Sequence, residues 1–308
     1  MSETHRILVV VEPEIHPQEV VARGTWLAGL TGSGLDLLLC DPEIGPLTDH
    51  WYVSSEAEQI GARIRAAQQE LLNDLAAVPR ERGIDVSTQV FEERPLAESL
   101  IDHIRDARPQ YVMKGTQFHS TAERAFFVES DWRLIRSCPA PLYLVKQADL
   151  PERPVIMAAV DPTHAHDKPA ALDRAIVAAA QDIAGKTDGD VHLVHTYHRL
   201  VGIGYEATRT FKPVELPIDA LEKKMRAEHR ASLDKLAGDA GVDGEHVHQL
   251  PGRARDILPA FARTHGVNLV VMGALARWGL KRAVIGSTAE RVLDHLPCDV
   301  LIVRTGED

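Results

Sequence analysis

The chain has 308 residues, 44% of them hydrophobic and 26% charged, which supplies enough apolar material for a core and excludes a disordered chain. Its length is about twice the most common domain size, so two domains or one large α/β domain are expected. The formal net charge of −11 repels phosphate backbones and anionic lipid headgroups, so we expect neither nucleic acid nor a membrane as its partner.

The cysteines and the N-terminus indicate a compartment. Three cysteines without paired spacing favour reduced thiols over a disulfide framework, and each is expected to be a small core residue. The chain enters its first apolar run without a signal-peptide pattern, and no stretch approaches the ~18 consecutive apolar residues of a membrane helix. We therefore expect a cytoplasmic protein.

Short apolar runs alternate with longer helical patterns along the whole chain. In the first half we expect strands near 6–11, 35–40, 85–91, 110–114 and 141–145, and helices near 17–31, 55–82, 96–107 and 130–137. In the second half we expect strands near 155–160, 190–197, 246–250, 268–272 and 299–303, with an amphipathic helix near 218–240 covering the sheet. This alternation predicts an α/β fold, a parallel sheet with helices on both faces.

The two halves are copies of one unit. Residues 111–115 match 269–273, and residues 138–146 match 296–304, both at an offset of 158. The first strands align at an offset of 149, so the second half carries about nine extra residues (158 − 149), which we place in a long loop over 199–217.

A polar linker rich in proline separates the copies. It predicts two domains, residues 1–147 and residues 154–308.

A candidate ligand site follows the fourth strand of the second half. The chain leaves that strand at Gly273, passes Lys281 and Arg282, and enters a helix at Gly286-Ser287-Thr288. Glycines let a phosphate approach the backbone, and helix N-terminal amides attract anions, so this stretch is a candidate phosphate cradle. The S-x-x-E spacing that begins at Ser287 also fits a capping box that needs no ligand.

The second half resembles the universal stress protein family at this point. The likeness rests on the strand-end Asp161, the Val-Met-Gly of 271–273, the helix start at 286–293 and the closing residues 297–303. The first half is similar to the N-terminal repeat of the tandem, UspE-like type of that family, through residues 112–116, 130–136 and 138–146.

The resemblance implies both a fold and a function. The fold is two tandem Rossmann-like (adenine nucleotide alpha hydrolase-like) domains, each a five-stranded parallel sheet flanked by helices, paired through their final strands as an intramolecular pseudo-dimer. Members of the family are stress-response proteins that are not typically enzymes, and a subset binds ATP.

In the ATP-binding subset the pattern is G-x2-G-x9-G-[ST], with an acidic residue after the first strand near the adenosine. The resemblance carries this site over to Asp161, Gly273, Gly286, Ser287 and Thr288. Ala276 stands where the second glycine belongs, and its Cβ would crowd the phosphates. His195 occupies the position beside the adenine pocket, and it reads equally well as a histidine at the rim of the sheet.

The first half departs further from this pattern. Phe118 and Val128 replace the second and third glycines, Glu129 replaces the serine, and Glu12 replaces the aspartate. A carboxylate where phosphate would lie repels it, so we expect no ATP in domain 1 and a nucleotide site only in domain 2.

Histidines raise the question of a metal. Residues three apart on a strand point to opposite faces, so His192 and His195 are not expected to converge, whereas His246 and His248 share a face. We expect solvated or capping histidines and no bound metal.

Three functions stay open. The first is a non-enzymatic binding module for ATP or another anionic small molecule, and the second is a nucleotide-using enzyme with slow ATP hydrolysis. The third is a binder of a non-nucleotide small molecule, with residues 199–217 as a lid. No G-x-S-x-G, P-loop or C-x-x-C motif is present, so no catalytic residue is assigned. Further homo-dimerisation of the pseudo-dimer is also open.

Overall fold

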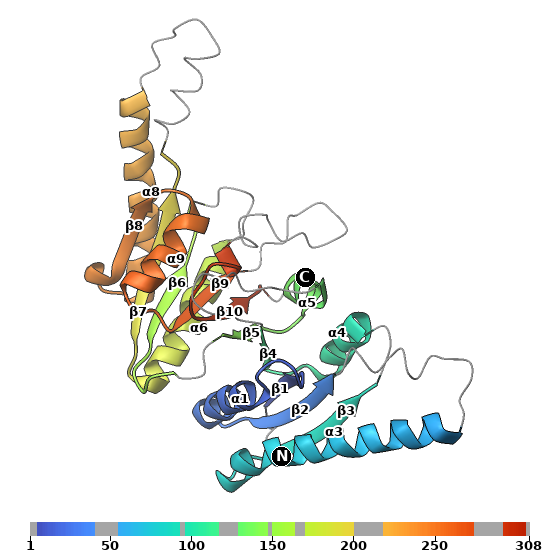
Figure 1. The fold of residues 1–308 in the computed structure, drawn as a ribbon. Coiled ribbons are helices and arrows are strands. Elements are labelled where there is room, and N and C mark those ends of the chain that lie inside the picture. Colours follow the sequence, from blue (N-terminus) through green and yellow to red (C-terminus); the bar gives the residue numbers. More distant parts are fainter. Residues whose placement is uncertain are drawn as a thin grey trace, which may run out of the picture. The chain divides into compact units, whose positions relative to one another are not determined.

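A computed structural model describes residues 5–40, 55–92, 96–116, 129–146, 150–163, 170–199, 218–273 and 292–305. The strands are β1 (Arg6–Val11), β2 (Gly34–Cys40), β3 (Val86–Phe91), β4 (Tyr111–Gly115), β5 (Leu142–Val145), β6 (Val155–Ala159), β7 (Asp190–Tyr197), β8 (Val247–Pro251), β9 (Leu269–Gly273) and β10 (Asp299–Val303) (Figure 1). The α-helices are α1 (Pro17–Thr31), α3 (Ser55–Glu81), α4 (Leu96–Ala107), α5 (Glu129–Ser137), α6 (Ala170–Thr187), α8 (Ile218–Ala240) and α9 (Ala254–Thr264), and η1 (Gly244–His246) is a short 3-10 helix.

The predicted strands and helices are confirmed to within one residue at each end. Residues 200–217, where we expect the long loop, lie outside the described part of the chain. Among the described helices, none combines the length and the apolar character that a membrane span requires.

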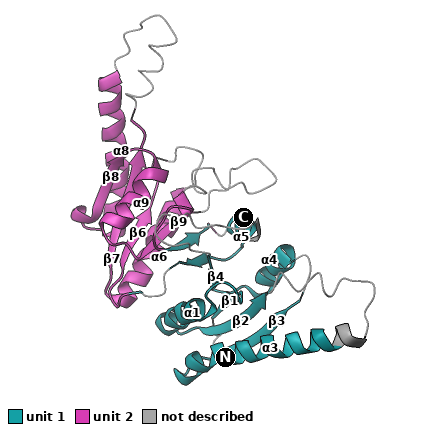
Figure 2. Ribbon diagram, viewed as in Figure 1, with its two compact units in different colours: residues 1–150, 299–304 teal, residues 151–298, 305–308 magenta. Residues whose placement is uncertain are grey.

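The chain divides into two compact units, coloured teal and magenta in Figure 2. Unit 1 comprises residues 1–150 and 299–304, and its strands follow the hydrogen-bonded order β3-β2-β1-β4-β5-β10. β1 to β5 run parallel. β1 lies inside the sheet and is buried from residue 7 to residue 11, because its continuous apolar run can be covered by helices on both faces. β10 pairs with β5 in the antiparallel sense.

Unit 2 comprises residues 151–298 and 305–308, and its strands follow the order β9-β6-β7-β8. All three strand pairs are parallel. The chain runs outward from β6 to β7 and β8 and then returns to the other side of β6 as β9. The order therefore reverses between β6 and β9, and in such sheets ligands bind beyond the carboxyl ends of the strands at this reversal.

The α/β class is confirmed, but the count of five strands per sheet is wrong. The ten strands follow a single hydrogen-bonded order, β3-β2-β1-β4-β5-β10-β9-β6-β7-β8. The physical reason is the edge of β5, which would otherwise present unpaired amides and carbonyls, and which β10 from the second repeat covers.

A buried carboxylate holds β10 in unit 1. Asp299 is completely buried, and its carboxylate lies 2.7 Å from the guanidinium of Arg23, itself buried on α1. It also accepts hydrogen bonds from the hydroxyl of Tyr143 (3.0 Å) and the backbone amide of Lys146 (2.7 Å). Because these partners come from the first repeat, the last strand of the second repeat completes the core of unit 1.

Candidate functional site

The candidate site in unit 2 begins where β6 ends. Asp161 lies two residues beyond β6, and its backbone amide donates to Oδ1 of Asp173, a buried residue in the first turn of α6. The Thr163 hydroxyl donates to Oδ1 of Asp161 at 2.7 Å. These bonds fix the strand end, while the Asp161 side chain stays 32% exposed and can accept hydrogen bonds from a ligand.

His195 lies beside this carboxylate, at the buried end of β7. Its side chain is 2% exposed, and Nδ1 lies 3.1 Å from the carbonyl oxygen of Val160 and 3.8 Å from Oδ1 of Asp161. Burial lowers the pKa of His195, and the Val160 carbonyl and the Asp161 charge oppose this shift only in part. Because a carbonyl only accepts, the proton of the neutral ring lies on Nδ1 and Nε2 carries a lone pair.

His229 on α8 donates a hydrogen bond to this lone pair. Its Nδ1 lies 2.9 Å from Nε2 of His195, so Nδ1 of His229 is the donor of this hydrogen bond. The lone pair of a neutral His229 then lies on Nε2. Tyr197 packs edge-on against the His229 ring with 6.0 Å between centroids, which further restricts the ring. Asp161, His195 and His229 thus form a continuous polar array from the strand end to α8.

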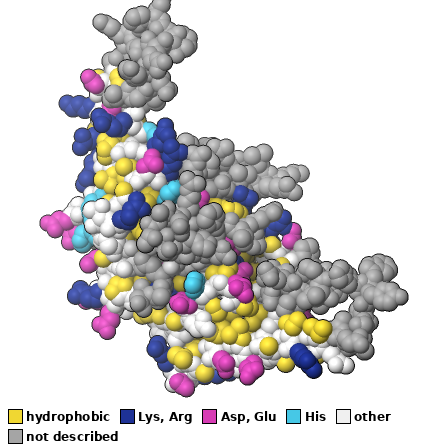
Figure 3. All heavy atoms as spheres, in the orientation of Figure 1, with side chains coloured by type: hydrophobic (Ala, Val, Ile, Leu, Met, Phe, Trp, Pro, Cys, Tyr) yellow, Lys and Arg dark blue, Asp and Glu magenta, His cyan; other side chains and the backbone are white. Residues whose placement is uncertain are grey.

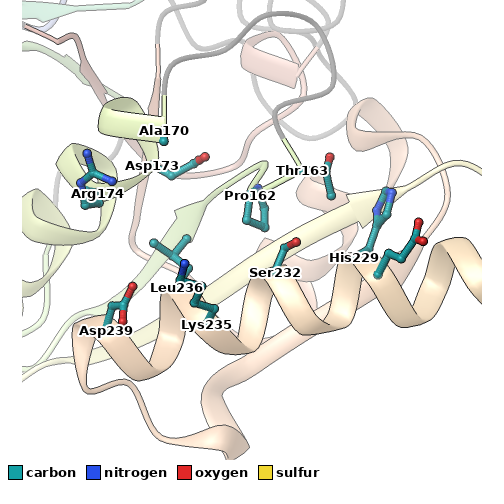
Figure 4. A pocket seen from close by; sticks show the side chains of 11 residues that line it. Pro162, Thr163, Ala170, Asp173, Arg174, His229, Ser232, Lys235, Leu236 and Asp239 are labelled. Carbon is teal, nitrogen blue, oxygen red and sulfur yellow. The ribbon is translucent and has the colours of Figure 1, made fainter.

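A cavity of about 560 Å³ adjoins this array (Figure 4). The residues that line it come from the turn after β6, the first turns of α6 and one side of α8: Pro162, Thr163, Ala170, Asp173, Arg174, Glu228, His229, Ser232, Lys235, Leu236 and Asp239. Since both acidic and basic side chains line it, the cavity is suited to a ligand with hydrogen-bonding groups and charge of either sign rather than to a bare phosphate.

Gly273 has a packing role in the structure. A Cβ at this position would lie 2.6 Å from Cδ2 and 2.8 Å from Cγ of Leu172 on α6. The equivalent Gly115 is similarly close to Ile15 and Val20 in unit 1, where we expect no nucleotide. Glycine is therefore required for the helix to approach the strand, and it does not by itself indicate a phosphate.

The other predicted cradle residues, Ala276, Gly286, Ser287 and Thr288, lie outside the described residues. Phe118 and Val128 of the first half also lie there. The phosphate cradle and its loss in domain 1 therefore stay predictions, as do the domain limits 1–147 and 154–308.

The equivalent strand end in unit 1 is closed by an ion-pair network. Glu12, which matches Asp161, forms an ion pair with Lys114 on β4, whose side chain is 2% exposed. Nζ of Lys114 also lies 2.7 Å from Oδ1 of the buried Asp131 on α5. Burial opposes the charge of Lys114, but the carboxylates of Glu12 and Asp131 raise its pKa above the ordinary value. Lys114 is matched by Met272 in unit 2, where the strand-end Asp161 stays open.

Several of these residues carry only a weak signal in the sequence. Lys114 is the one cation in an otherwise apolar strand, which the sequence shows. Its partners, Glu12 just after β1 and Asp131 on α5, cannot be predicted from local sequence patterns. His229 lies in a charged helix, 34 residues from His195, and nothing in its surroundings distinguishes it. His192 and His195 point to opposite faces of β7, as the strand periodicity predicts, since they contact different histidines.

The structure belongs to the class of repeated α/β proteins with parallel strands, and the strand end of its second unit is open to a ligand. The model of the universal stress protein family matches residues 3–146 and again residues 153–304, and the chain belongs to that family.

Its relatives include proteins that the chain matches over nearly their whole length. The chain is 26% identical to universal stress protein E of Escherichia coli strain K12, over 99% of this chain and 95% of that protein. It is 24% identical to the protein of the same name from Photorhabdus laumondii, over 99% of this chain and 96% of that protein.

Among solved structures, a functionally unknown protein from Pseudomonas aeruginosa PAO1 is similar with a TM-score of 0.74 and 26% identity, covering 99% of this chain and 94% of that one. A universal stress protein from Archaeoglobus fulgidus is similar in fold, with a TM-score of 0.62 and 14% identity, covering 96% of this chain and 97% of that one.

Proposed function

We propose that the protein is a stress-response binding module that holds one anionic small molecule, an adenine nucleotide, at the strand end of domain 2. The observation that carries this proposal is the difference between the two copies. Glu12 in unit 1 is neutralised by a buried lysine, whereas Asp161 in unit 2 remains 32% exposed at the reversal of strand order.

Each residue has a definite role in this proposal. The Asp161 carboxylate accepts hydrogen bonds from ribose hydroxyls, as acidic residues do in other nucleotide-binding α/β folds. Nε2 of His229 offers a further acceptor to the nucleoside. Gly286, Ser287 and Thr288 hold the phosphates at a helix N-terminus, where local amides overcome the unfavourable net charge of −11.

The chemistry of the described residues supports binding rather than catalysis. The three cysteines, Cys40, Cys138 and Cys298, are buried and form no disulfide, and burial raises the pKa of Cys138 to about 11. A buried thiol of this kind is not a nucleophile at neutral pH. Cysteines outside disulfides are typical of a reducing compartment, so we include a cytoplasmic location in the proposal.

Titration of ATP into the full chain, followed by calorimetry and native mass spectrometry, tests this function. Wild type is expected to bind one ATP. Asp161→Asn keeps an acceptor for Thr163 but loses the charge, and should bind at least about tenfold more weakly, which corresponds to ~1.4 kcal/mol. Gly286→Glu places a carboxylate in the cradle and should abolish binding.

The matched control is Glu12→Gln, which changes the equivalent carboxyl in unit 1 and should leave ATP affinity unchanged. Failure of wild type to bind ATP, or equal affinity in all three variants, would refute the proposed site. Multiple turnover of ATP to ADP, lost in Asp161→Asn, would replace the binding module with a slow ATPase.

A further inference from the structure

A cluster of four histidines lies on the other face of β7, away from His195. His192 is on β7, His246 ends η1, His248 is on β8 and His265 follows α9. The His192 ring lies 4.8 Å from that of His246, 5.2 Å from that of His248 and 5.9 Å from that of His265, between centroids. Figure 3 shows histidine side chains at the surface on the side of unit 2 where β8 lies.

The register of the strands brings these rings together. Leu193 pairs with Val247, so the residues just before them, His192 and His246, are neighbours across the two strands. His248 follows on the same face of β8, because side chains two residues apart on a strand share a face. His192 and His248 therefore lie on regular, hydrogen-bonded strands.

His192 and His248 meet nitrogen to nitrogen. Nδ1 of His192 lies 2.9 Å from Nε2 of His248, and only one of these nitrogens can carry the shared hydrogen. A metal ion with M–N bonds of ~2.0–2.1 Å in tetrahedral geometry needs ~3.3 Å between two nitrogens. If the two rings move slightly apart, an ion fits between Nδ1 of His192 and Nε2 of His248. The hydrogen that the two nitrogens shared then moves to the other nitrogen of the ring that carries it, so that no proton is released.

His265 supplies a third imidazole with a fixed tautomer. Its Nδ1 lies 3.1 Å from the carbonyl oxygen of Phe261, so Nδ1 carries the hydrogen and Nε2 is the nitrogen with the lone pair. Its ring stacks on Phe261 with 3.8 Å between centroids, which holds its plane. Histidines that ligate metals commonly donate their other N–H to a backbone carbonyl in this way.

We propose that this cluster is a binding site for a divalent transition metal ion that prefers imidazole, Cu²⁺, Ni²⁺ or Zn²⁺, with His192 and His248 as the chelating pair and His265 as the third ligand. Within the described ranges, no three His, Cys, Asp or Glu side chains already converge on a metal position, so binding includes the small separation of the rings. The site is independent of the proposed nucleotide function, because it lies on the opposite face of β7.

The test uses the full chain without a polyhistidine tag. NiCl₂ or ZnCl₂ is titrated at pH 7.5 by calorimetry, and the midpoint of thermal unfolding is measured with and without the metal. Wild type should bind one equivalent and unfold at higher temperature, because an ion that binds only the folded state stabilises it. His192→Gln and His248→Gln should each weaken binding by about 10- to 100-fold or more, since loss of only a hydrogen-bond partner of a metal ligand already costs that much.

Two further variants keep the test interpretable. His265→Gln changes an exposed residue, so that folding is preserved, and should weaken binding less than either variant of the pair. His103→Gln removes a histidine that packs against Phe91 in unit 1, and should bind metal like wild type. Equal affinity in wild type, His192→Gln and His248→Gln, or wild-type affinity weaker than ~1 mM, would overturn the proposal, whatever the result for ATP.

Discussion

At the residue scale, the two copies differ most clearly where Lys114 stands in one and Met272 in the other. In unit 1 the buried ammonium holds Glu12 and Asp131 in one network, and in unit 2 no lysine occupies the equivalent position. Removing one member of a buried ion pair leaves an uncompensated charge, which lowers the free energy of unfolding strongly. Replacing the whole pair by apolar side chains changes that free energy much less. The buried lysine therefore closes the strand end of unit 1, and the second copy has Met272 in its place.

Lys114→Met tests this interpretation. The substitution leaves two buried carboxylates facing each other, so the free energy of unfolding should fall by about 3–5 kcal/mol. Urea unfolding followed by tryptophan fluorescence measures it, because Trp26 and Trp132 lie in unit 1. Lys186→Met is the control, since its exposed pair with Asp182 is worth only about 0.3–0.5 kcal/mol. A loss below about 1 kcal/mol for Lys114→Met would show that the carboxyls simply become protonated.

Gly273→Ala separates packing from ligand binding at a predicted site residue. The added Cβ meets Leu172 of α6 at 2.6 Å, so overpacking should lower the free energy of unfolding by about 1–3 kcal/mol without any ligand. Gly185→Ala is the matched control, because nothing lies within 4 Å of its Cβ and alanine favours a helix by about 0.5–1 kcal/mol. Unchanged stability in ligand-free Gly273→Ala would instead favour a role in binding.

At the element scale, β7 separates two histidine groups because its side chains alternate between faces. His195 meets His229 of α8 on one face, and His192 meets His248 of β8 on the other. The alternation was predictable from the sequence, since it depends only on spacing along one strand. The histidines that His192 and His195 contact were not predictable, because those contacts depend on how α8 and α9 pack, and no local sequence period encodes that packing.

The buried His195 predicts a pH dependence. Its pKa is lowered by burial, so the folded state binds fewer protons than the unfolded state below the ordinary value of about 6.5. Its contribution to stability is therefore present above pH ~6.5 and is lost as the pH falls toward the folded pKa, with a slope of up to ~1.4 kcal/mol per pH unit.

Urea unfolding between pH 8 and pH 5 measures this slope. His195→Gln does not titrate, so its stability should fall less steeply below pH 6.5 than that of wild type. His103→Gln, in unit 1, should keep the wild-type slope because its ring lies outside this array. Identical slopes for wild type and His195→Gln would mean that His195 is protonated equally in both states.

At the scale of the whole molecule, the sequence repeat predicts two similar domains, and in the structure the last strand of the second copy groups with unit 1. Element positions follow from local periodicity, so they were predictable to within one residue. The family resemblance implies that the final strands of the two repeats pair, and β10 lies between β5 of the first repeat and β9 of its own in the hydrogen-bonded order. The buried contacts of Asp299 with Arg23 and Tyr143, 276 and 156 residues away, could not be predicted, because no local period encodes which distant residues a buried carboxylate meets.

The pairing of β10 with β5 makes the stability of unit 1 depend on residues 299–303. Asp299→Ala removes the carboxylate that faces Arg23, Tyr143 and the Lys146 amide, and should lower the free energy of unfolding by about 3–5 kcal/mol. Asp182→Ala is the control, because it removes an exposed aspartate that pairs with Lys186 and should cost less than about 1 kcal/mol. Hydrogen exchange locates the effect: the amides of β4 and β5 should lose protection in Asp299→Ala, although the substituted residue belongs to the second repeat. Loss of protection confined to β9 and β6 would contradict this assignment, since it would mean that β10 stabilises only its own repeat.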